Sequence, residues 1–336
     1  MTYRAAVIGC GKIGSEFADD PRIKDIYTHA GAYSACSETN LVAVCDADAT
    51  KVKRCGARWN VPATFQNPAD MMMSARPEVV SICTPDPTHH AVLREVMKHD
   101  CVRAIYAEKP LAMSRADAQE ILSIAESRNI HIAVNYFRRY APTLRELRAA
   151  IVQDRCIGEI QALNCSYTKG ILHNGTHLLD LARFLAGEIE SIRGIPNRRS
   201  NLEKTDTSLD AHLRFASGAS GFIQGFNEDR FDICEMDITG TAGRIRILDS
   251  GHTIEHYEVR DDPNYSGYLG LALKIRDTRG MTDTLLHGVE DLVSCIGSGK
   301  APLCSGYDGY AALDLGLAIH ESARTGNLIT LKNGVT

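Results

Sequence analysis

A glycine-rich loop near the N-terminus constrains the fold more than any other feature. Residues 9–14 read Gly-Cys-Gly-Lys-Ile-Gly, directly after a β-rich run at 4–8 and before a helical pattern. In such a strand–loop–helix setting, one glycine makes a tight turn, one lets the backbone approach a pyrophosphate, and one lets the helix pack closely. The loop therefore predicts a dinucleotide-binding domain, with the N-terminus of the following helix facing the phosphates.

Strand and helix patterns alternate through the first half of the chain. Apolar strand-like runs recur at 41–45, 79–83, 104–107 and 130–134, with helical segments between them, such as 90–99 and 115–128. This order predicts βαβ units with right-handed crossovers, and hence a doubly wound parallel sheet with helices on both faces. We expect this α/β domain to span residues 1–133.

The second half has a different pattern. Strand-like runs dominate, at 160–167, 208–215, 220–226, 233–239 and 244–248, and helical patterns return at 287–296 and 310–325. We expect residues 134–336 to form an α+β domain with an open, mostly antiparallel sheet. Because a large open sheet face needs covering, we also expect a homo-oligomer, either a dimer or a tetramer.

Composition excludes several classes of function. The 336 residues carry a formal net charge of −5 and no basic stripe, which argues against a nucleic-acid partner. No run approaches the roughly 20 apolar residues of a membrane span, and the N-terminus lacks a signal-peptide pattern. The 11 cysteines include no Cys-x-x-Cys pair, so we expect neither a disulfide framework nor a structural zinc site, and a reducing, cytoplasmic location.

Asp46 is the expected acidic partner of the glycine loop, because it ends the second strand-like run. The interval exceeds the usual ~20 residues, and the segment 19–25 reads as an insertion that lengthens it. A carboxylate here accepts hydrogen bonds from a ribose diol and repels a 2′-phosphate, which favours NAD over NADP. NADP stays an alternative, because the cationic residues Lys51, Lys53 and Arg54 follow Asp46.

Several further motifs occur in a fixed order. They are Thr-Pro-x-x-x-His at 84–89, Glu-Lys-Pro at 108–110, Gly-Thr-His-Leu-Leu-Asp at 175–180, and a closing stretch at 299–309. With the glycine loop, they resemble the glucose–fructose oxidoreductase / inositol dehydrogenase family over nearly the whole chain. The resemblance implies a Rossmann domain, a second α/β domain, a nicotinamide cofactor and a substrate cleft between the domains. It also implies oxidation or reduction of a hydroxyl on a sugar, polyol or nucleotide sugar.

Lys109 is the first candidate for proton transfer. A hydride leaves a carbinol carbon only as the hydroxyl loses its proton, so a base must lie within hydrogen-bond reach. Lys109 ends a strand at the edge of a parallel sheet where ligands bind, and burial there would lower its pKa. The alternative is a surface lysine paired with Glu108. Pro110 restricts the backbone at Lys109, and the bond between them can be cis or trans.

His177 is the expected partner in acid–base chemistry, because the resemblance places it over the reacting carbon. Asp180, one turn later, would orient it or hold the helix. Much of the family has an aspartate four residues before this histidine, whereas this chain has His173, so the terminal base stays open. A helix over 170–185 would place all three side chains near one face, which also permits zinc or a purely structural role. The glutamate of a His-Glu-x-x-His site is missing, and we expect no metal.

The remaining candidates follow from the same motifs. The residues expected to bind the cofactor are Gly9, Gly11, Lys12, Ile13, Gly14, Asp46, Thr84, Pro85, His89, Glu108 and Lys109. Those expected to bind substrate are Lys109, Arg139, Lys169, Asn174 and His177, and Asn135 and Tyr136 are placed to face the cleft. Three of these residues also have a purely structural alternative: an ion pair for Arg139, a solvated turn for Lys169, and a helix cap for His89.

These observations predict an NAD(P)-dependent oxidoreductase that acts on a sugar-like small molecule, with Lys109, His177 and His173 in proton transfer. One alternative is a non-catalytic NAD-binding regulatory protein on the same fold. Another is a metal-dependent hydrolase built on the histidine pair.

Overall fold

The computed structural model describes residues 2–197 and 206–331. By contacts within the chain, it divides into two compact units. The first comprises Met1–Tyr140 and Thr282–Leu313, and the second comprises Ala141–Met281 and Asp314–Thr336. The sequence analysis placed all of 134–336 in one domain, so the segment 282–313 is assigned differently here.

The reason is that this late segment packs on the first sheet. Helix α8 (Thr284–Ser298) contacts α1, β5 and β6 (bounds below). Val134 N donates to Cys304 O at 2.9 Å, and Ser305 forms a bridge to Ala133, so residues 304–305 extend the sheet beyond β6. Helix α9 (Gly306–Thr325) begins in the first unit and ends in the second.

The first unit is built on a six-stranded parallel sheet in the order β3-β2-β1-β4-β5-β6. This is the Rossmann order, and it confirms the predicted doubly wound sheet. The central strands are buried on both faces, as expected when helices cover each side. The strands are β1 (Tyr3–Ile8), β2 (Thr39–Cys45), β3 (Ala63–Phe65), β4 (Val79–Ile82), β5 (Ala104–Ala107) and β6 (His131–Val134).

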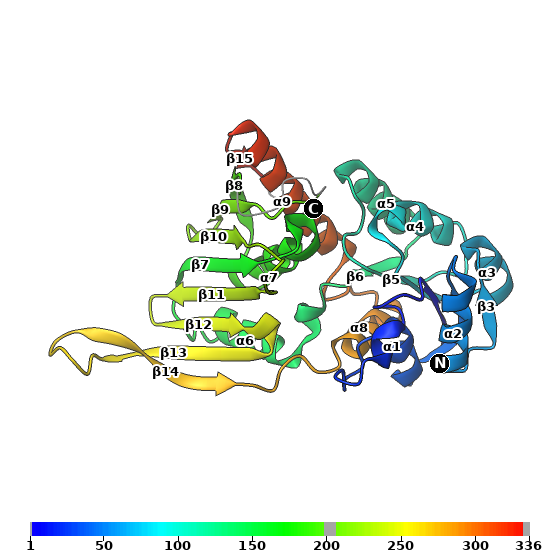
Figure 1. Cartoon of the computed structure of the whole chain (residues 1–336), viewed down its shortest axis with the longest axis horizontal. Coiled ribbons are helices and arrows are strands. Elements are labelled where there is room, and N and C mark those ends of the chain that lie inside the picture. The colour runs from blue at the N-terminus through cyan, green and yellow to red at the C-terminus, as the bar shows by residue number, and fades with distance from the viewer. Residues whose placement is uncertain (1, 198–205, 332–336) are drawn as a thin grey trace. The chain divides into compact units, whose positions relative to one another are not determined.

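The helices of this unit start at local capping residues. Thr28, Asp48, Asn67 and Ser114 each accept a hydrogen bond from a backbone N–H in the first turn of a helix. Figure 1 shows these helices in blue to cyan. They are α1 (His29–Ala35), α2 (Ala49–Trp59), α3 (Pro68–Ala75), α4 (His89–Met97) and α5 (Arg115–Ser127), with short 3₁₀ turns η1 (Glu16–Asp19), η2 (Asp86–Thr88) and η3 (Phe137–Tyr140).

The helix expected directly after the glycine loop is interrupted, which corrects that prediction. The α-helix proper begins only at His29, and an insertion that includes η1 separates it from the loop. His29 N donates to Ile13 O and Ala30 N donates to Gly14 O, both at 3.0 Å. In an uninterrupted helix these acceptors would bond residues 17 and 18. The insertion is therefore looped out, and α1 continues the turn that the glycine loop begins.

The second unit contains a nine-stranded sheet in the order β14-β13-β12-β11-β7-β10-β9-β8-β15. Among the described strands of this sheet, only the β7–β10 pair is parallel, so the predicted mostly antiparallel sheet is confirmed. The strands are β7 (Ile160–Tyr167), β8 (Ile189–Ile195), β9 (Asp210–Phe215), β10 (Ser220–Gly225), β11 (Cys234–Gly240), β12 (Gly243–Leu248), β13 (Thr253–Asp261), β14 (Leu269–Asp277) and β15 (Ile329–Thr330).

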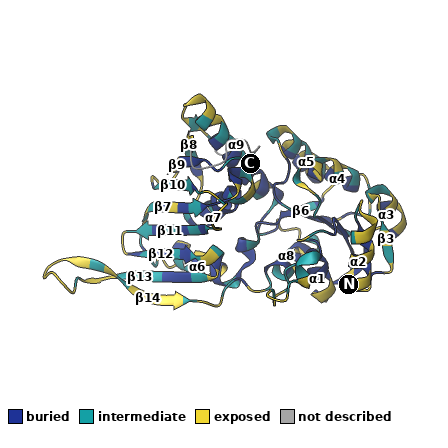
Figure 2. Cartoon of the chain, viewed as in Figure 1, coloured by how far each residue is buried: buried dark blue, intermediate teal, exposed yellow. Residues whose placement is uncertain are grey.

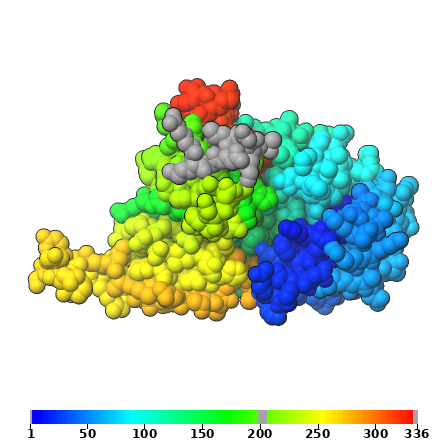
Figure 3. All heavy atoms as spheres, in the orientation of Figure 1, coloured from blue at the N-terminus to red at the C-terminus, as the bar shows by residue number. Residues whose placement is uncertain are grey.

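Helices cover part of this sheet. Helix α7 (Thr176–Ala186) contacts β7 and β11, and α6 (Pro142–Val152) packs on α7. The turn η5 (Asp249–Gly251) joins β12 to β13. Figure 2 shows that much of β14 is exposed, and in Figure 3 the end of the β13–β14 hairpin extends away from the rest of its unit.

Two general properties complete the description. All eleven cysteines lie in the described residues, and none of them forms a disulfide bond. Across the described part of the chain, none of the helices combines the length and hydrophobicity that crossing a membrane requires.

Candidate active site

The three glycines of the loop differ in the space that the fold leaves for a side chain. Gly9 has a φ of +99°, and a Cβ there would lie 2.4 Å from the Cys83 carbonyl. A Cβ on Gly14 would lie 2.0 Å from Gly9 O. By contrast, a Cβ on Gly11 would meet nothing within 4 Å. The fold itself requires Gly9 and Gly14, whereas Gly11 faces open space, where a ligand can approach the backbone.

Asp46 lies beside this loop, directly after β2. Its Oδ2 accepts a hydrogen bond from Cys10 N at 2.7 Å, and its Oδ1 accepts one from Asp48 N at 2.9 Å. The carboxylate is thus fixed next to the glycine turn. Of the nearby cations, Arg54 pairs with Glu16 of the insertion.

The loop after β4 carries Thr84. Its Oγ1 is buried and has no hydrogen-bond partner among the described residues. The fully buried imidazole of His89 holds this loop, with Nε2 2.8 Å from Thr84 O and Nδ1 2.6 Å from Pro110 O. Because both ring nitrogens bond backbone carbonyls, His89 ties the β4 loop to the β5 loop.

The Glu-Lys-Pro motif follows β5, and the peptide bond between Lys109 and Pro110 is cis. Lys109 is buried. The side chain of Glu108 accepts two hydrogen bonds at Oε1, from His29 Nε2 at 3.1 Å and from Asn135 Nδ2 at 2.6 Å. Burial alone would raise the pKa of Glu108, but the hydrogen bond and charge of His29, the Asn135 bond and the Lys109 charge together lower it below its ordinary value.

These features gather at one edge of the first sheet. The glycine loop, Asp46, Thr84, Lys109 and Asn135 all follow the carboxyl ends of parallel strands. That edge is where open α/β sheets bind ligands. The space at Gly11, the anchored Asp46 carboxylate and the unpartnered Thr84 hydroxyl all fit a dinucleotide.

The histidine segment of the second unit is not one continuous α-helix, contrary to the sequence-based expectation. Residues Gly170–Gly175 form a π-helical turn, and α7 begins at Thr176. A π turn inserts an extra residue, so His173 does not share the α-helical spacing of His177 and Asp180. His173 is exposed, whereas His177 and Asp180 are buried on α7.

Asp206 holds the start of this turn, and the sequence analysis missed it. Its Oδ1 accepts from Leu172 N at 3.0 Å and its Oδ2 accepts from His173 N at 2.8 Å. Gly170 has a φ of +80°, and a Cβ there would lie 2.1 Å from Asp206 Oδ2. Asp206 is 33 residues beyond His173 in the chain, so no local spacing could reveal the contact.

The remaining substrate candidates have varied surroundings. Arg139 donates to Leu303 O and lies 3.1 Å from Asp308 Oδ1, both within the first unit. We therefore leave Arg139 out of the proposed substrate site. Lys169 is exposed and pairs with Asp232 at 2.8 Å. Asn174 is half-buried in the π turn.

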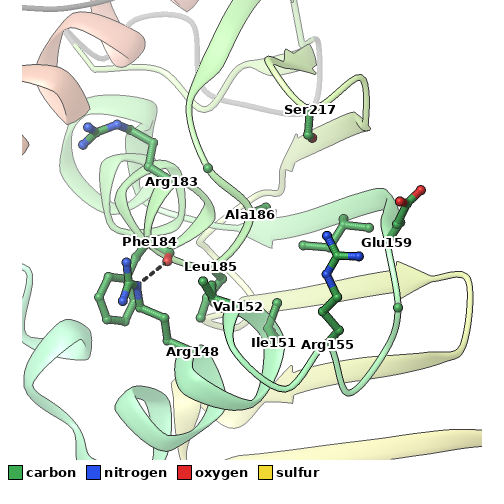
Figure 4. Close-up of a pocket in the computed structure, with 13 residues that line it drawn as sticks. Arg148, Ile151, Val152, Arg155, Glu159, Arg183, Phe184, Leu185, Ala186 and Ser217 are labelled. Atoms are coloured by element: carbon green, nitrogen blue, oxygen red, sulfur yellow. Dashed lines mark hydrogen bonds between the residues drawn. The ribbon is translucent and has the colours of Figure 1, made fainter.

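A cavity of about 600 Å³ lies elsewhere in the second unit, where α6 and α7 end (Figure 4). Three arginines line it, and two of them bond protein groups: Arg148 donates to Phe184 O and Arg183 pairs with Glu188. It contains none of the expected site residues. Among residues 2–197 and 206–331, no three His, Cys, Asp or Glu side chains are grouped so that they could hold a metal ion.

Comparison with known families decides the identity of the fold. Residues 3–136 match the model described as an oxidoreductase family with an NAD-binding Rossmann fold, and residues 145–246 match the GFO/IDH/MocA C-terminal domain. The chain belongs to the GFO/IDH/MocA oxidoreductase family. Its first unit is accordingly an NAD-binding Rossmann domain, which confirms the predicted cofactor class and the predicted resemblance.

Several relatives of this GFO/IDH/MocA chain are named for sugars or inositol. A D-apiose dehydrogenase of Paraburkholderia graminis is 22% identical over 355 residues, covering 98% of this chain and 90% of that protein. A myo-inositol 2-dehydrogenase of Thermotoga maritima is 23% identical, covering 95% and 96%. A solved levoglucosan dehydrogenase in complex with NADH superposes with a TM-score of 0.81 at 17% identity, covering 99% and 100%.

Proposed function

We propose that this protein is an NAD-dependent dehydrogenase that transfers a hydride between the nicotinamide and a hydroxyl-bearing carbon of a cyclic sugar or polyol. The observation that carries the proposal is the placement of Glu108 and Lys109 at the carboxyl edge of the sheet that also holds the glycine loop and Asp46. A buried lysine at that edge is suited to chemistry rather than to solvation.

Each cofactor-binding residue has a distinct role in the proposal. The open side of Gly11, with Lys12 and Ile13 beside it, receives the pyrophosphate, and Asp46 accepts hydrogen bonds from the adenosine ribose diol. Thr84 and Pro85 line the cofactor, with the Thr84 hydroxyl available as a partner. When bound, the nicotinamide accepts or donates the hydride.

Lys109 and His177 share the proton transfer in this proposal. The substrate hydroxyl must lose its proton as the hydride leaves, and both an amine and an imidazole can hold that proton near neutral pH. Asp180, three residues after His177 on α7, is spaced to orient it. His173 is exposed and can pass the proton to water.

The names of several relatives support the proposed substrate class. Apiose, myo-inositol and levoglucosan, named for proteins similar to this one, are all small, uncharged and rich in hydroxyl groups. Asn174 and Lys169, in and beside the π turn, supply hydrogen-bonding groups for such a substrate.

The test is reduced-nicotinamide absorbance with NAD or NADP against a panel of polyols, free sugars, sugar phosphates and nucleotide sugars. We expect turnover with NAD that falls about 10²–10⁴-fold in Lys109→Met and in His177→Ala. Lys98→Met, which removes a surface lysine paired with Glu95, is the matched control and should retain full activity. NADH binding without turnover on any substrate would favour the regulatory alternative, and turnover that survives both substitutions would contradict the assigned roles.

The proposed assembly is a homo-oligomer formed through the second sheet. Leu269, Leu271 and Leu273 alternate along β14 and are all exposed, so they share one apolar face. We expect a dimer or tetramer in light scattering at micromolar concentration, and dissociation in Leu271→Lys. A monomeric wild-type protein would contradict this assembly. Eleven cysteines without a disulfide among them suit a reducing compartment, and we propose that the protein is cytoplasmic.

A further inference from the structure

A chain of hydrogen-bonded polar side chains, all buried except the partly buried Glu108, includes the residue that precedes Lys109 in the first unit. We call it the Glu108 network, and its members in order are Tyr33, Ser81, His29, Glu108, Asn135 and Tyr106. On one side of Glu108, His29 Nε2 lies 3.1 Å from Glu108 Oε1, and His29 Nδ1 lies 2.8 Å from Ser81 Oγ. The Ser81 and Tyr33 hydroxyls are 2.9 Å apart. On the other side, Asn135 Nδ2 lies 2.6 Å from Glu108 Oε1, and Tyr106 Oη lies 2.8 Å from Asn135 Oδ1.

The carboxylate fixes the direction of these hydrogen bonds. Ionised Glu108 can only accept, so His29 must carry a proton on Nε2. At Nδ1, His29 contacts the Ser81 hydroxyl, which donates to the Tyr33 hydroxyl.

A nucleophilic role for Ser81 is excluded by its surroundings. A serine, a histidine and a carboxylate occur here in the order used by serine hydrolases. However, both Ser81 and His29 have 0% of their surface exposed, and the Ser81 hydroxyl also contacts Tyr33. A substrate therefore cannot reach the Ser81 hydroxyl. The group in this network that can influence chemistry is Glu108, which is next to Lys109.

His29 is the main group that keeps Glu108 charged. The other titratable groups that face Glu108 are Tyr27, Cys83, Tyr106 and Lys109. Burial raises the pKa of Tyr27, Cys83 and Tyr106, so these three stay neutral near pH 7 and contribute no positive charge. The His29 hydrogen bond and charge favour the ionised carboxylate most, followed by the Asn135 hydrogen bond and the Lys109 charge.

His29 also connects the glycine loop to the Glu-Lys-Pro motif, both of which lie at the carboxyl edge of the first sheet. Its backbone N–H donates to Ile13 O of the glycine loop, while its side chain contacts Glu108, next to Lys109. Both contacts depend on the looped-out insertion, which brings His29 to the first turn of α1.

We propose that His29 is a positioning residue that keeps Glu108 ionised and fixed beside Lys109, and thereby sets the charge that Lys109 experiences during proton transfer. The part that concerns Lys109 rests on the proposed function, whereas the part that concerns Glu108 does not. Reciprocity of the charge interaction supplies the link: the Lys109 ammonium stabilises the Glu108 carboxylate, so the carboxylate equally stabilises the ammonium.

The first test measures Glu108 directly by infrared spectroscopy of the full chain at pH 7. In His29→Leu we expect the absorption band of a protonated carboxylic acid, which disappears when Glu108→Gln is added. Wild type should lack the band, and so should His29→Gln, whose amide nitrogen can replace Nε2 as a donor. Tyr33→Phe, which leaves the contact between His29 and Glu108 intact, is the matched control and should also lack it. His29→Asn, whose shorter amide does not reach Glu108, should behave like the leucine variant and serves if leucine prevents folding.

The second test measures the pH dependence of kcat with a substrate from the panel. We expect the profile to move toward lower pH by about one unit in His29→Leu, and to return in His29→Gln, with NADH affinity changed less than threefold. A Glu108 that stays ionised in both His29→Leu and His29→Asn overturns the proposal, and so does an unmoved pH profile. A protein that turns over no substrate overturns the proposed function, while the infrared result still decides the link between His29 and Glu108.

Discussion

The Asp46 carboxylate accepts a hydrogen bond from the backbone N–H of Cys10, 2.7 Å away, in the middle of the glycine loop. The residue expected to recognise the ribose therefore also stabilises the loop expected to hold the pyrophosphate. One side chain thus links the two parts of the cofactor site that lie after β1 and β2.

Substitution of Asp46 separates these two roles. Asp46→Asn retains an oxygen that can accept from Cys10 N but loses the charge, so we expect the loop to stay folded. NADH affinity should fall by about 1.5–3 kcal/mol, the usual contribution of a hydrogen bond to a charged group. NADPH affinity should fall less, because the repulsion of a 2′-phosphate is also removed. Fluorescence titration with both nucleotides measures the ratio, and an unchanged ratio would contradict the assignment of Asp46.

The loop glycines offer a second contrast. Gly11→Ala places a methyl group in open space, so we expect normal stability but weaker NADH binding. Gly14→Ala forces a methyl group against Gly9 O and should lower the free energy of unfolding by about 1–3 kcal/mol, as overpacking does. Urea unfolding and NADH titration of both variants distinguish the two effects. Equal loss of stability in both variants would show that Gly11 is also required by the fold.

Asp206 provides a prediction for the second unit. Asp206→Ala removes the acceptor of two backbone N–H groups at the start of the π turn, so the segment that carries His173 and leads to His177 should lose its fixed position. We expect kcat to fall about 10–100-fold, as for a misplaced catalytic group, while the Kd for NADH stays unchanged, because the cofactor residues lie in the first unit. Asp206→Asn, which keeps one acceptor oxygen, should recover part of the activity. A loss of NADH affinity in Asp206→Ala would contradict this reasoning.

Much of the fold could be predicted from local patterns. The five parallel strands identified in the first half are apolar runs buried on both faces, and such runs are visible in the sequence without any partner. The β13 and β14 strands were not predicted, because charged residues interrupt their pattern. Those charges pair between the strands, as Lys274 does with Glu258 and Arg276 with Glu255, and a pairing of that kind has no local signal.

The residues of the candidate site likewise fall into those that the sequence could predict and those that only the fold brings together. The glycine loop, Asp46 and Lys109 could be found from the sequence, because each ends a recognisable strand. His29 and Asp206 could not, since their partners lie 79 and 33 residues away and only the fold brings them together. The π turn before α7 was missed because it keeps the same residue types as an α-helix and differs only in its hydrogen bonds.

The β13–β14 hairpin provides a prediction about pH. The carboxylate of Glu255 is buried on β13, and it accepts from the Tyr257 hydroxyl at 2.7 Å and from Arg276 Nη2 at 2.6 Å. These two hydrogen bonds, with the Arg276 and Arg246 charges, lower the pKa of Glu255 below 4.5. A carboxyl group with a lowered pKa in the folded state stabilises the protein above its unfolded pKa. That stabilisation is lost as the pH falls through the folded value.

We therefore expect the cost of Glu255→Gln to depend on pH. At pH 7 the substitution should lower the free energy of unfolding by about 1.5–3 kcal/mol, because it removes hydrogen bonds to a buried charge. The difference from wild type should shrink as the pH falls from about 4.5 through the lowered pKa of the folded state, since the wild-type carboxylate becomes protonated over that range. Urea unfolding at several pH values measures this. Glu38→Gln, at an exposed glutamate, controls for the change in net charge. A cost that stays constant from pH 7 into the acidic range would show that Glu255 contributes through packing rather than through its charge.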